Sequence, residues 1–196
     1  MIQFFEPLLL NNKKVKVQPV LTPDNYIKSI LPVLNSAKKS LYMQTQYMHA
    51  ASNSPAAFLS LVKAIQTKIL AGVDVKLIVH KREKDSGWLE KLRDIPFDTS
   101  VIRLQDGVHN KGIVVDSKIV VVGSHNWSSN GTIDNRDASL IFFHAGIAKY
   151  FEKIFLHDWT RLASPDGGAT PRMRIAIPGE ATPQGFRRMK LKDVLD

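Results

Sequence analysis

The 196-residue sequence contains no cysteine, which excludes disulfide bonds and thiolate chemistry. It also has no apolar run near the roughly 18 residues that a membrane-spanning helix needs. The nearest stretch, residues 4–10, is interrupted by Glu6 and Pro7, and no basic start with a long apolar centre marks a secretory signal. We therefore expect a soluble protein, and the lack of cysteine fits a reducing compartment such as the cytoplasm.

Metal-binding patterns are missing from the sequence as well. It has no H-E-x-x-H helix, and its most polar stretch has no dense carboxylate pair that would hold two magnesium ions. We therefore expect that the protein needs neither a metal ion nor another cofactor.

Positive charge is what the sequence has in excess. It contains 27 lysines and arginines against 18 aspartates and glutamates, and its formal net charge is +9. A basic surface favours polyanions, either nucleic acid or anionic lipid headgroups. The length suits one domain with a substantial core, and an apolar content of 44% is ordinary for a globular protein.

The most informative stretch covers residues 108–137, VHNKGIVVDSKIVVVGSHNWSSNGTIDNRD. Two apolar runs, 113–115 and 119–122, are separated by three polar residues, which predicts a β-hairpin with a polar turn. A two-residue turn would pair His109 with Ser124, and a three-residue turn would shift this pairing by one residue. In both registers the polar residues before and after the hairpin meet at its open end.

The residues at this open end have complementary chemistry. His109 and Lys111 point to one face of their strand because side chains alternate, and Ser124 and Asn126 share a face of theirs. A lysine cation with hydroxyl and amide donors suits an anion, most naturally a phosphoryl group. A histidine beside it can act as a nucleophile or as a general acid or base near neutral pH. The set predicts a phosphoryl-transfer site rather than a hairpin with a solvated histidine at its mouth.

These spacings resemble the signature of the phospholipase D superfamily, H-x-K-x4-D-x6-G-S-x-N. The family also carries a carboxylate after the motif, usually glutamate, and here Asp137 stands 28 residues after His109. The resemblance implies that Asp137 holds the tautomer of the catalytic histidine. Trp127 continues the motif with the usual aromatic residue. The residues that match the signature are His109, Lys111, Asp116, Gly123, Ser124 and Asn126.

The resemblance implies a metal-independent phosphodiesterase that uses two copies of the motif. One histidine attacks phosphorus to form a covalent phosphohistidine, the other protonates the leaving oxygen, and water then releases the product. Lys111 and Asn126 would bind the charge that develops on the equatorial oxygens. The hairpin geometry instead gives Asp116 a structural role, because it lies at the turn and far from the phosphate.

The chain contains one copy of the motif, which leaves two interpretations open. Two identical chains could pool their motifs about a two-fold axis as a homodimer, as in the small bacterial phosphodiesterase-nucleases that this length resembles. Alternatively, the chain could be the C-terminal half of a two-motif enzyme. The entry segment and the long tail favour the second interpretation for the native protein.

The rest of the chain alternates strands and helices. This order predicts a mixed sheet covered on both faces, in agreement with the α/β/α sandwich that the resemblance implies. We expect a catalytic domain over residues 1–163 and an extended basic tail over 164–196. Pro32 should bend or shorten the first helix. The expected strands cover 15–21, 40–47, 73–79, 99–104 and 138–143, and the expected helices start at Thr22-Pro23 and at Ser54-Pro55 and cover 88–95 and 147–159; residues 128–137 are expected to form a polar loop.

Polar residues outside the motif are candidates for substrate binding. Gln44, Gln46 and His49 lie at the end of the second strand and could rim a cleft, and Lys81 and Arg82 begin a charged loop that could contact phosphates. A polar cleft and a basic chain favour a nuclease acting on DNA or RNA. A phospholipid is the alternative substrate, and a nucleic-acid binding module with little turnover is a second alternative. The intact motif argues against both a pure binding module and a wholly structural protein.

Overall fold

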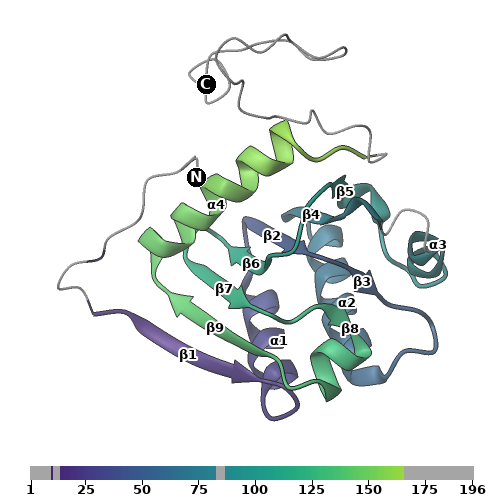
Figure 1. Cartoon of the computed structure of the whole chain (residues 1–196), viewed down its shortest axis with the longest axis horizontal. Helices are drawn as coiled ribbons and strands as arrows, with labels where there is room; N and C mark the ends of the chain where they lie inside the picture. Colours follow the sequence, from purple (N-terminus) through teal and green to yellow (C-terminus); the bar gives the residue numbers. More distant parts are fainter. Residues whose placement is uncertain (1–9, 11–13, 83–86, 166–196) are drawn as a thin grey trace, which may run out of the picture.

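The computed structural model describes residues 10, 14–82 and 87–165, and these form a layered α/β structure around one large sheet (Figure 1). The seven strands of this sheet lie in the order β1-β9-β7-β6-β2-β4-β5. Strands β2, β4 and β5 run parallel to one another, and all other pairs are antiparallel, so the sheet is mixed. The strands are β1 Lys16–Leu21, β2 Ser40–Thr45, β4 Asp74–His80, β5 Ile102–Gln105, β6 Lys111–Val115, β7 Ile119–Gly123 and β9 Ala138–Phe143.

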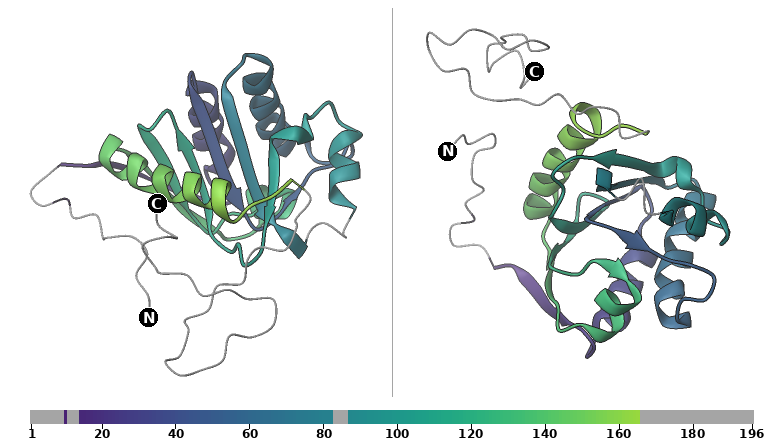
Figure 2. Two further views of the ribbon diagram at one scale, coloured as in Figure 1. Left: turned by 90° about the horizontal axis from the view of Figure 1, so that it is seen from above. Right: turned by 45° about the vertical axis from the view of Figure 1, so that its right-hand side comes forward.

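Helices cover both faces of the sheet, as the sequence predicts. Helices α1 (Tyr26–Ser36) and α2 (Ala56–Leu70) pack together on one face, and α4 (Ala145–Arg161) crosses the other face over β6, β7, β2 and β9. Both views in Figure 2 place α4 on the side opposite to α1 and α2. The prediction of an α/β/α sandwich is therefore confirmed. The remaining elements are α3 (Trp88–Arg93), a 3-10 turn at Thr99–Val101, a π-helical turn at Asn130–Asp134, and the short parallel pair β3 (Met48–His49) and β8 (Trp127–Ser128).

Two hydrophobic cores result from the alternation of side chains along the central strands. Met43 of β2 and Ile113 of β6 belong to the core under α1 and α2. Their neighbours Tyr42 and Val114 belong to the core under α4, where the Tyr42 ring stacks on Phe155 at 5.1 Å. Full burial of an apolar side chain of this size stabilises the fold by roughly 1.5–3 kcal/mol, so both helical layers hold the sheet in place.

The first helix begins later than predicted and does not end at Pro32. It begins at Tyr26 rather than at Thr22-Pro23. Thr22 is fully buried, and its hydroxyl donates to the Gly131 carbonyl at 3.4 Å. Pro32 lies inside the helix, which continues to Ser36. The helix tolerates Pro32 because the burial of neighbouring apolar residues outweighs the loss of one backbone hydrogen bond.

Two further segments differ in detail from their predictions. The start of the expected strand 99–104 is a 3-10 turn, because the Asp98 side chain accepts the Ser100 backbone N–H at 2.9 Å and the strand begins only at Ile102. The expected loop 128–137 contains the π-helical turn, in which the Thr132 hydroxyl donates to the Ser128 carbonyl at 2.7 Å.

The predicted boundary between domain and tail falls at the edge of the described chain. Ser164 pairs with Leu104 of β5 through two backbone hydrogen bonds of 2.8 and 3.0 Å, so the main sheet contacts the chain just beyond Ala163. Residues 166–196, which make up the predicted basic tail except for its first two residues, lie outside the described residues. None of the helices in the described part of the chain combines the length and apolarity that a bilayer crossing requires.

Candidate active site

The hairpin that carries the motif is formed by β6 and β7 and has a three-residue turn. Lys111 pairs with Gly123 and Val115 with Ile119, so His109 is not directly opposite Ser124. Asp116 and Ser117 have φ values of 51° and 55°, and the Lys118 N–H donates to the Val115 carbonyl at 2.9 Å. Of the two registers that the sequence left open, the structure has the one for a three-residue turn.

Asp116 lies at the turn end of the hairpin and binds the backbone before β2. Its carboxylate accepts the N–H of Lys38 at 3.0 Å, of Lys39 at 2.7 Å and of Ser40 at 2.9 Å. Partial burial alone would raise the pKa of Asp116, but these backbone donors lower it overall. The contacts tie the turn to the first residue of β2 and support a structural role for Asp116.

The H-x-K half of the motif forms a cluster at the open end of the hairpin. The Lys111 Nζ donates to the His109 carbonyl and lies 3.4 Å from His109 Nδ1 and 3.4 Å from Gln46 Oε1. Burial lowers the pKa of Lys111, and the charge of Asp137 acts in the opposite direction. His109 is exposed, so an incoming group can reach its ring.

The G-S-x-N half approaches strand β9 so closely that only glycine fits at position 123. A Cβ on Gly123 would collide with Ser139 Oγ and the Ala138 carbonyl. The Ser124 N–H donates to the same carbonyl at 2.9 Å. Asn126 Oδ1 is buried, and no group in the described residues donates to it. Unpaired buried acceptors of this kind are uncommon in folded proteins.

Asp137 contacts the second half of the motif and not the histidine. Its Oδ1 accepts the Ser124 hydroxyl at 2.6 Å, and within residues 14–82 and 87–165 no bond joins it to His109. This differs from the tautomer-holding contact that the resemblance implies. Asp137 immediately precedes β9, where the backbone of Ser124 pairs with Ala138, and its short side chain therefore meets Ser124 first.

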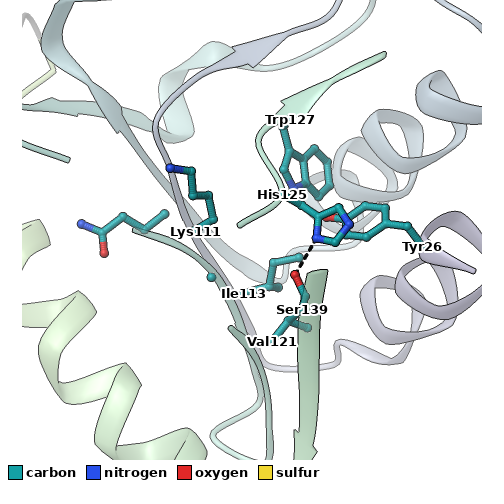
Figure 3. Close-up of a pocket in the computed structure, with 9 residues that line it drawn as sticks. Tyr26, Lys111, Ile113, Val121, His125, Trp127 and Ser139 are labelled. Atoms are coloured by element: carbon teal, nitrogen blue, oxygen red, sulfur yellow. Dashed lines mark hydrogen bonds between the residues drawn. The ribbon is translucent and has the colours of Figure 1, made fainter. Parts of the chain in front are cut away.

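A small pocket beside Lys111 contains a histidine that the sequence interpretation did not single out (Figure 3). His125 is only 2% exposed, its Nδ1 lies 2.6 Å from Ser139 Oγ, and its ring stacks on Tyr26 at 4.0 Å. Burial lowers the pKa of His125 to about 4, so the ring is neutral at pH 7. The sequence contained one indication of this: His125 lies between Ser124 and Asn126, so its side chain is expected on the side of the chain opposite to theirs.

The predicted substrate-binding residues at the end of β2 separate in the structure. Gln46 joins the site through Lys111. Gln44, expected at the rim of a cleft, is instead only 6% exposed and turned toward α4. The physical reason is its parity with Tyr42, which faces the core under α4. Gln44 therefore bonds Asn110 and Asp158, and it also lines the pocket beside Lys111.

Of the other three candidates, Lys81 and Arg82 lie beside the end of β2, and His49 lies in β3. Lys81 and Arg82 directly follow β4, whose parallel pairing with β2 brings them to the edge where Gln46 lies. The Arg82 N–H donates to His80 Nδ1 at 2.9 Å, and its side chain is exposed. His49, in β3, stacks on Tyr47 at 4.6 Å and lines a separate cavity of about 210 Å³. Phosphate contacts by these residues stay predictions. The cavity is lined by His49, Ala50, Ala51, Trp88 and Lys91.

The described residues contain no preformed metal site. No group of three or more histidine, aspartate or glutamate side chains there is arranged to hold a metal ion. The chemistry available to the site is that of an exposed imidazole beside a partly desolvated lysine ammonium, with neutral donors on the neighbouring strand.

The sequence of the chain matches a family of known proteins. The family described as "Cardiolipin synthase, PLD-like domain" matches residues 30–159, about two thirds of the chain. A cardiolipin synthase from Clostridium perfringens is 29% identical over 134 residues, which cover 64% of this chain and 26% of that protein. The chain thus spans about a quarter of the length of the curated relatives it matches.

Solved structures show the same fold in shorter proteins. Nuc from Salmonella typhimurium, a phospholipase D family member, superposes with a TM-score of 0.62 at 21% identity over 76% of this chain and 97% of Nuc. NucT from Helicobacter pylori gives a TM-score of 0.63 at 17% identity over 76% of this chain and 98% of NucT.

The family match covers more than half of the chain and therefore shows which family it belongs to. The chain belongs to the phospholipase D superfamily, in the family of cardiolipin synthase-type PLD-like domains.

Proposed function

We propose that this chain supplies one catalytic half-site of a metal-independent phosphodiesterase, with His109 as the nucleophile. The observation that carries the proposal is the cluster at the open end of the hairpin, where the Lys111 ammonium lies 3.4 Å from His109 Nδ1. Because Nδ1 faces the lysine, Nε2 is the ring nitrogen left for attack on phosphorus. The cation and the imidazole can then meet the same phosphoryl group.

The reaction follows from these roles in two displacements. His109 Nε2 bonds to phosphorus as the bond to the leaving oxygen breaks, and the histidine of a second motif gives that oxygen a proton. A water molecule then attacks phosphorus, gives its proton to the same second histidine, and releases the phosphate monoester from His109. An alcohol in place of water would give transfer instead of hydrolysis. Lys111 and Asn126 stabilise the charge on the equatorial oxygens in both steps.

The second motif must come from outside the sequence that contains the first. A second copy of this chain is one source, since a two-fold interface can bring the same edge of both copies together. The shared fold accounts for nearly the whole chains of Nuc and NucT, so a chain can consist of a single such domain. A second motif-bearing domain is the other source, and the much longer cardiolipin synthase relatives support it.

We propose a nucleic acid, DNA or RNA, as the first candidate substrate. The net charge of +9 favours a polyanion whose neighbouring phosphates extend beyond the site. Lys81 and Arg82, at the same edge as Gln46, are placed to meet such phosphates.

A phospholipid is the second candidate, and two observations favour it. The curated relatives are cardiolipin synthases, and the cavity beside β3 is bordered by Ala50, Ala51 and Trp88, which could contact apolar parts of a lipid. In this case the same half-site would cleave or transfer a headgroup diester.

The test is cleavage by the purified chain in excess EDTA, with single-stranded DNA, double-stranded DNA, RNA and phosphatidylglycerol vesicles as parallel substrates. We expect the parent to cleave at least one class, and His109→Ala to cleave none. Lys118→Ala, at the exposed turn end, is the matched control and should cleave like the parent. Equal cleavage by parent and His109→Ala would overturn the proposal.

The products of the reaction distinguish between the two candidate substrates. Nucleic-acid fragments without lipid turnover support the nuclease, and release or exchange of the lipid headgroup without nucleic-acid cleavage supports the lipid enzyme. Sedimentation of the active sample then separates the two sources of the second motif, because an active monomer would exclude a self-paired dimer.

A further inference from the structure

We propose that Gln44 and Asp158 form a relay that positions the H-x-K segment through Asn110, the residue between the histidine and the lysine. This inference rests on the proposed function, since its consequence is the rate of the reaction at His109. Gln44 and Asp158 bond each other on the α4 side of the sheet, and Gln44 also lines the pocket that contains Lys111. The three residues come from β2, from α4 and from the segment before β6.

The alternation of side chains separates this segment into a front and a back. Val108 is 2% exposed and belongs to the core under α4, and Asn110 donates to Gln44 on the same side. His109, between them, is exposed, and Lys111 lines the pocket on the α1 side. The exposed His109 therefore lies between the buried Val108 and Asn110, whose side chain is bonded to Gln44.

The relay is built on a buried amide with a defined orientation. Gln44 Nε2 donates to Asp158 Oδ2 at 3.0 Å, and Gln44 Oε1 accepts the Asn110 Nδ2 at 2.7 Å. An ionised carboxylate only accepts hydrogen bonds, so Asp158 requires the NH₂ group of Gln44 on its side. The oxygen of Gln44 is then the atom that faces Asn110. Asp158 thus determines which group Asn110 meets, although the two residues do not touch.

The far end of the relay lies in a well-connected part of the fold. The Asp158 carbonyl accepts the N–H groups of Leu162 and Ala163, both at 2.9 Å, and Ser164 then pairs with Leu104 of β5. Gln44 Nε2 also lies 3.4 Å from Gln105 Oε1 at the end of β5. Gln44 is therefore fixed by its own strand β2, by the last turn of α4 and by β5. Its bond to Asn110 in turn restrains the segment that carries His109.

The catalytic consequence is positional. The His109 carbonyl already accepts Lys111 Nζ, so a movement of Asn110 displaces the imidazole and the ammonium together. A misplacement of about 1 Å at such a site can lower a rate by roughly 100-fold. Gln44, Asn110 and Asp158 are accordingly positioning residues, and a change that breaks the hydrogen bonds between them should affect kcat more than KM.

The test reverses the direction of the hydrogen bond inside the relay. Gln44→Glu keeps an acceptor toward Asn110 but places two carboxylates against each other, and we expect kcat to fall by roughly 10- to 100-fold with KM within about threefold. Asp158→Asn retains an oxygen that can accept from Gln44 and should leave kcat within about threefold of the parent. The double variant Gln44→Glu/Asp158→Asn lets the new amide donate to the new carboxylate and should restore kcat to that range.

Two controls separate positioning from loss of fold. Tyr42→Phe, two residues earlier on β2, removes the hydroxyl bond to Asp74 on the same face and should lower stability without the kcat effect. The side-chain NH₂ signals of Asn110 in ¹⁵N NMR spectra should shift in Gln44→Glu and return in the double variant. A double variant with kcat as low as Gln44→Glu, or lower, would overturn the relay.

The design also distinguishes failure of the relay from failure of the proposed function. If the parent cleaves no diester, the proposed function fails, and the NMR signals of Asn110 alone decide whether the relay exists. If the parent cleaves and all three variants match it, the relay fails and the proposed function stands.

Discussion

The two ends of the β6–β7 hairpin have opposite hydrogen-bonding states. At the turn end, the Asp116 carboxylate accepts three backbone N–H groups and joins the turn to the start of β2. At the open end, Asn126 Oδ1 has no donor among the described residues, Lys111 is partly desolvated, and His109 is exposed. The carboxylate at the turn end has its hydrogen-bond donors within the chain, whereas the imidazole and the ammonium at the open end are placed to meet a ligand. The same signature therefore contains residues for stability and residues for chemistry, divided by their position along the strands.

The largest effect expected at the open end comes from His109→Ala. Loss of the nucleophile should lower kcat by about 1,000-fold or more. Because the side chain is exposed, the free energy of unfolding should change by less than about 0.5 kcal/mol. Steady-state cleavage and urea denaturation measure the two quantities, and a large loss of stability would contradict the division between the ends.

Lys111→Met should give the next largest effect. It removes the ammonium that faces the developing charge while keeping most of the apolar stem, and kcat should fall by about 100-fold or more. Lys118→Met, at the turn end, is the matched control and should retain the parent's kcat. If both variants have equal activity, Lys111 has no catalytic role.

Asp116→Ala should lower the stability of the fold rather than kcat. Three backbone N–H groups lose their acceptor, and we expect a loss of about 1–3 kcal/mol in the free energy of unfolding with little change in kcat at a temperature where the variant is folded. Circular dichroism melting and cleavage assays test this. A variant that melts like the parent and has lost its activity would place Asp116 in the chemistry.

His125 should give the smallest effect, visible as a pH dependence of stability. Its pKa is about 4 in the folded protein, against about 6.5 for an unfolded histidine. The folded state therefore binds the proton less readily, and its advantage is complete above pH 6.5 and declines as the pH falls toward 4. The two pKa values correspond to a loss of at most about 3 kcal/mol across this window.

The matched variant for this prediction is His125→Gln, which can still bond Ser139 but does not titrate. Urea denaturation at pH 7 and pH 4.5 should show a smaller decrease in stability for the variant than for the parent. An equal decrease in the two proteins would assign the acid sensitivity to other groups.

The architecture could be predicted from the sequence because its signals are local and repeated. Apolar runs and helical spacing placed β9 at Ala138–Phe143 and gave α2, closed by Gly72 with its positive φ of 75°. The hairpin followed from two apolar runs around a polar turn. Such patterns report which residues are buried, and burial determines most of the sheet and its two helical layers.

The details of the site depended on contacts that a linear pattern does not contain. Alternation shows that Gln44 and Gln46 share a face, yet Gln44 meets α4 while Gln46, just after β2 ends, meets Lys111. The partner of Asp137 likewise depends on the close approach of β7 and β9 at Gly123. The positions of Asn110 and His125 inside the motif suggest that both residues have a role there. The sequence does not show which residues they contact.

The most direct measurement of the central claim is mass spectrometry of the protein after rapid acid-free quenching of a reaction with its substrate. The account predicts a phosphoryl adduct on a peptide containing His109, labile in acid and absent in His109→Ala. A parent protein that turns over substrate without any adduct at His109, under conditions where hydrolysis of the adduct is slower than its formation, would contradict it.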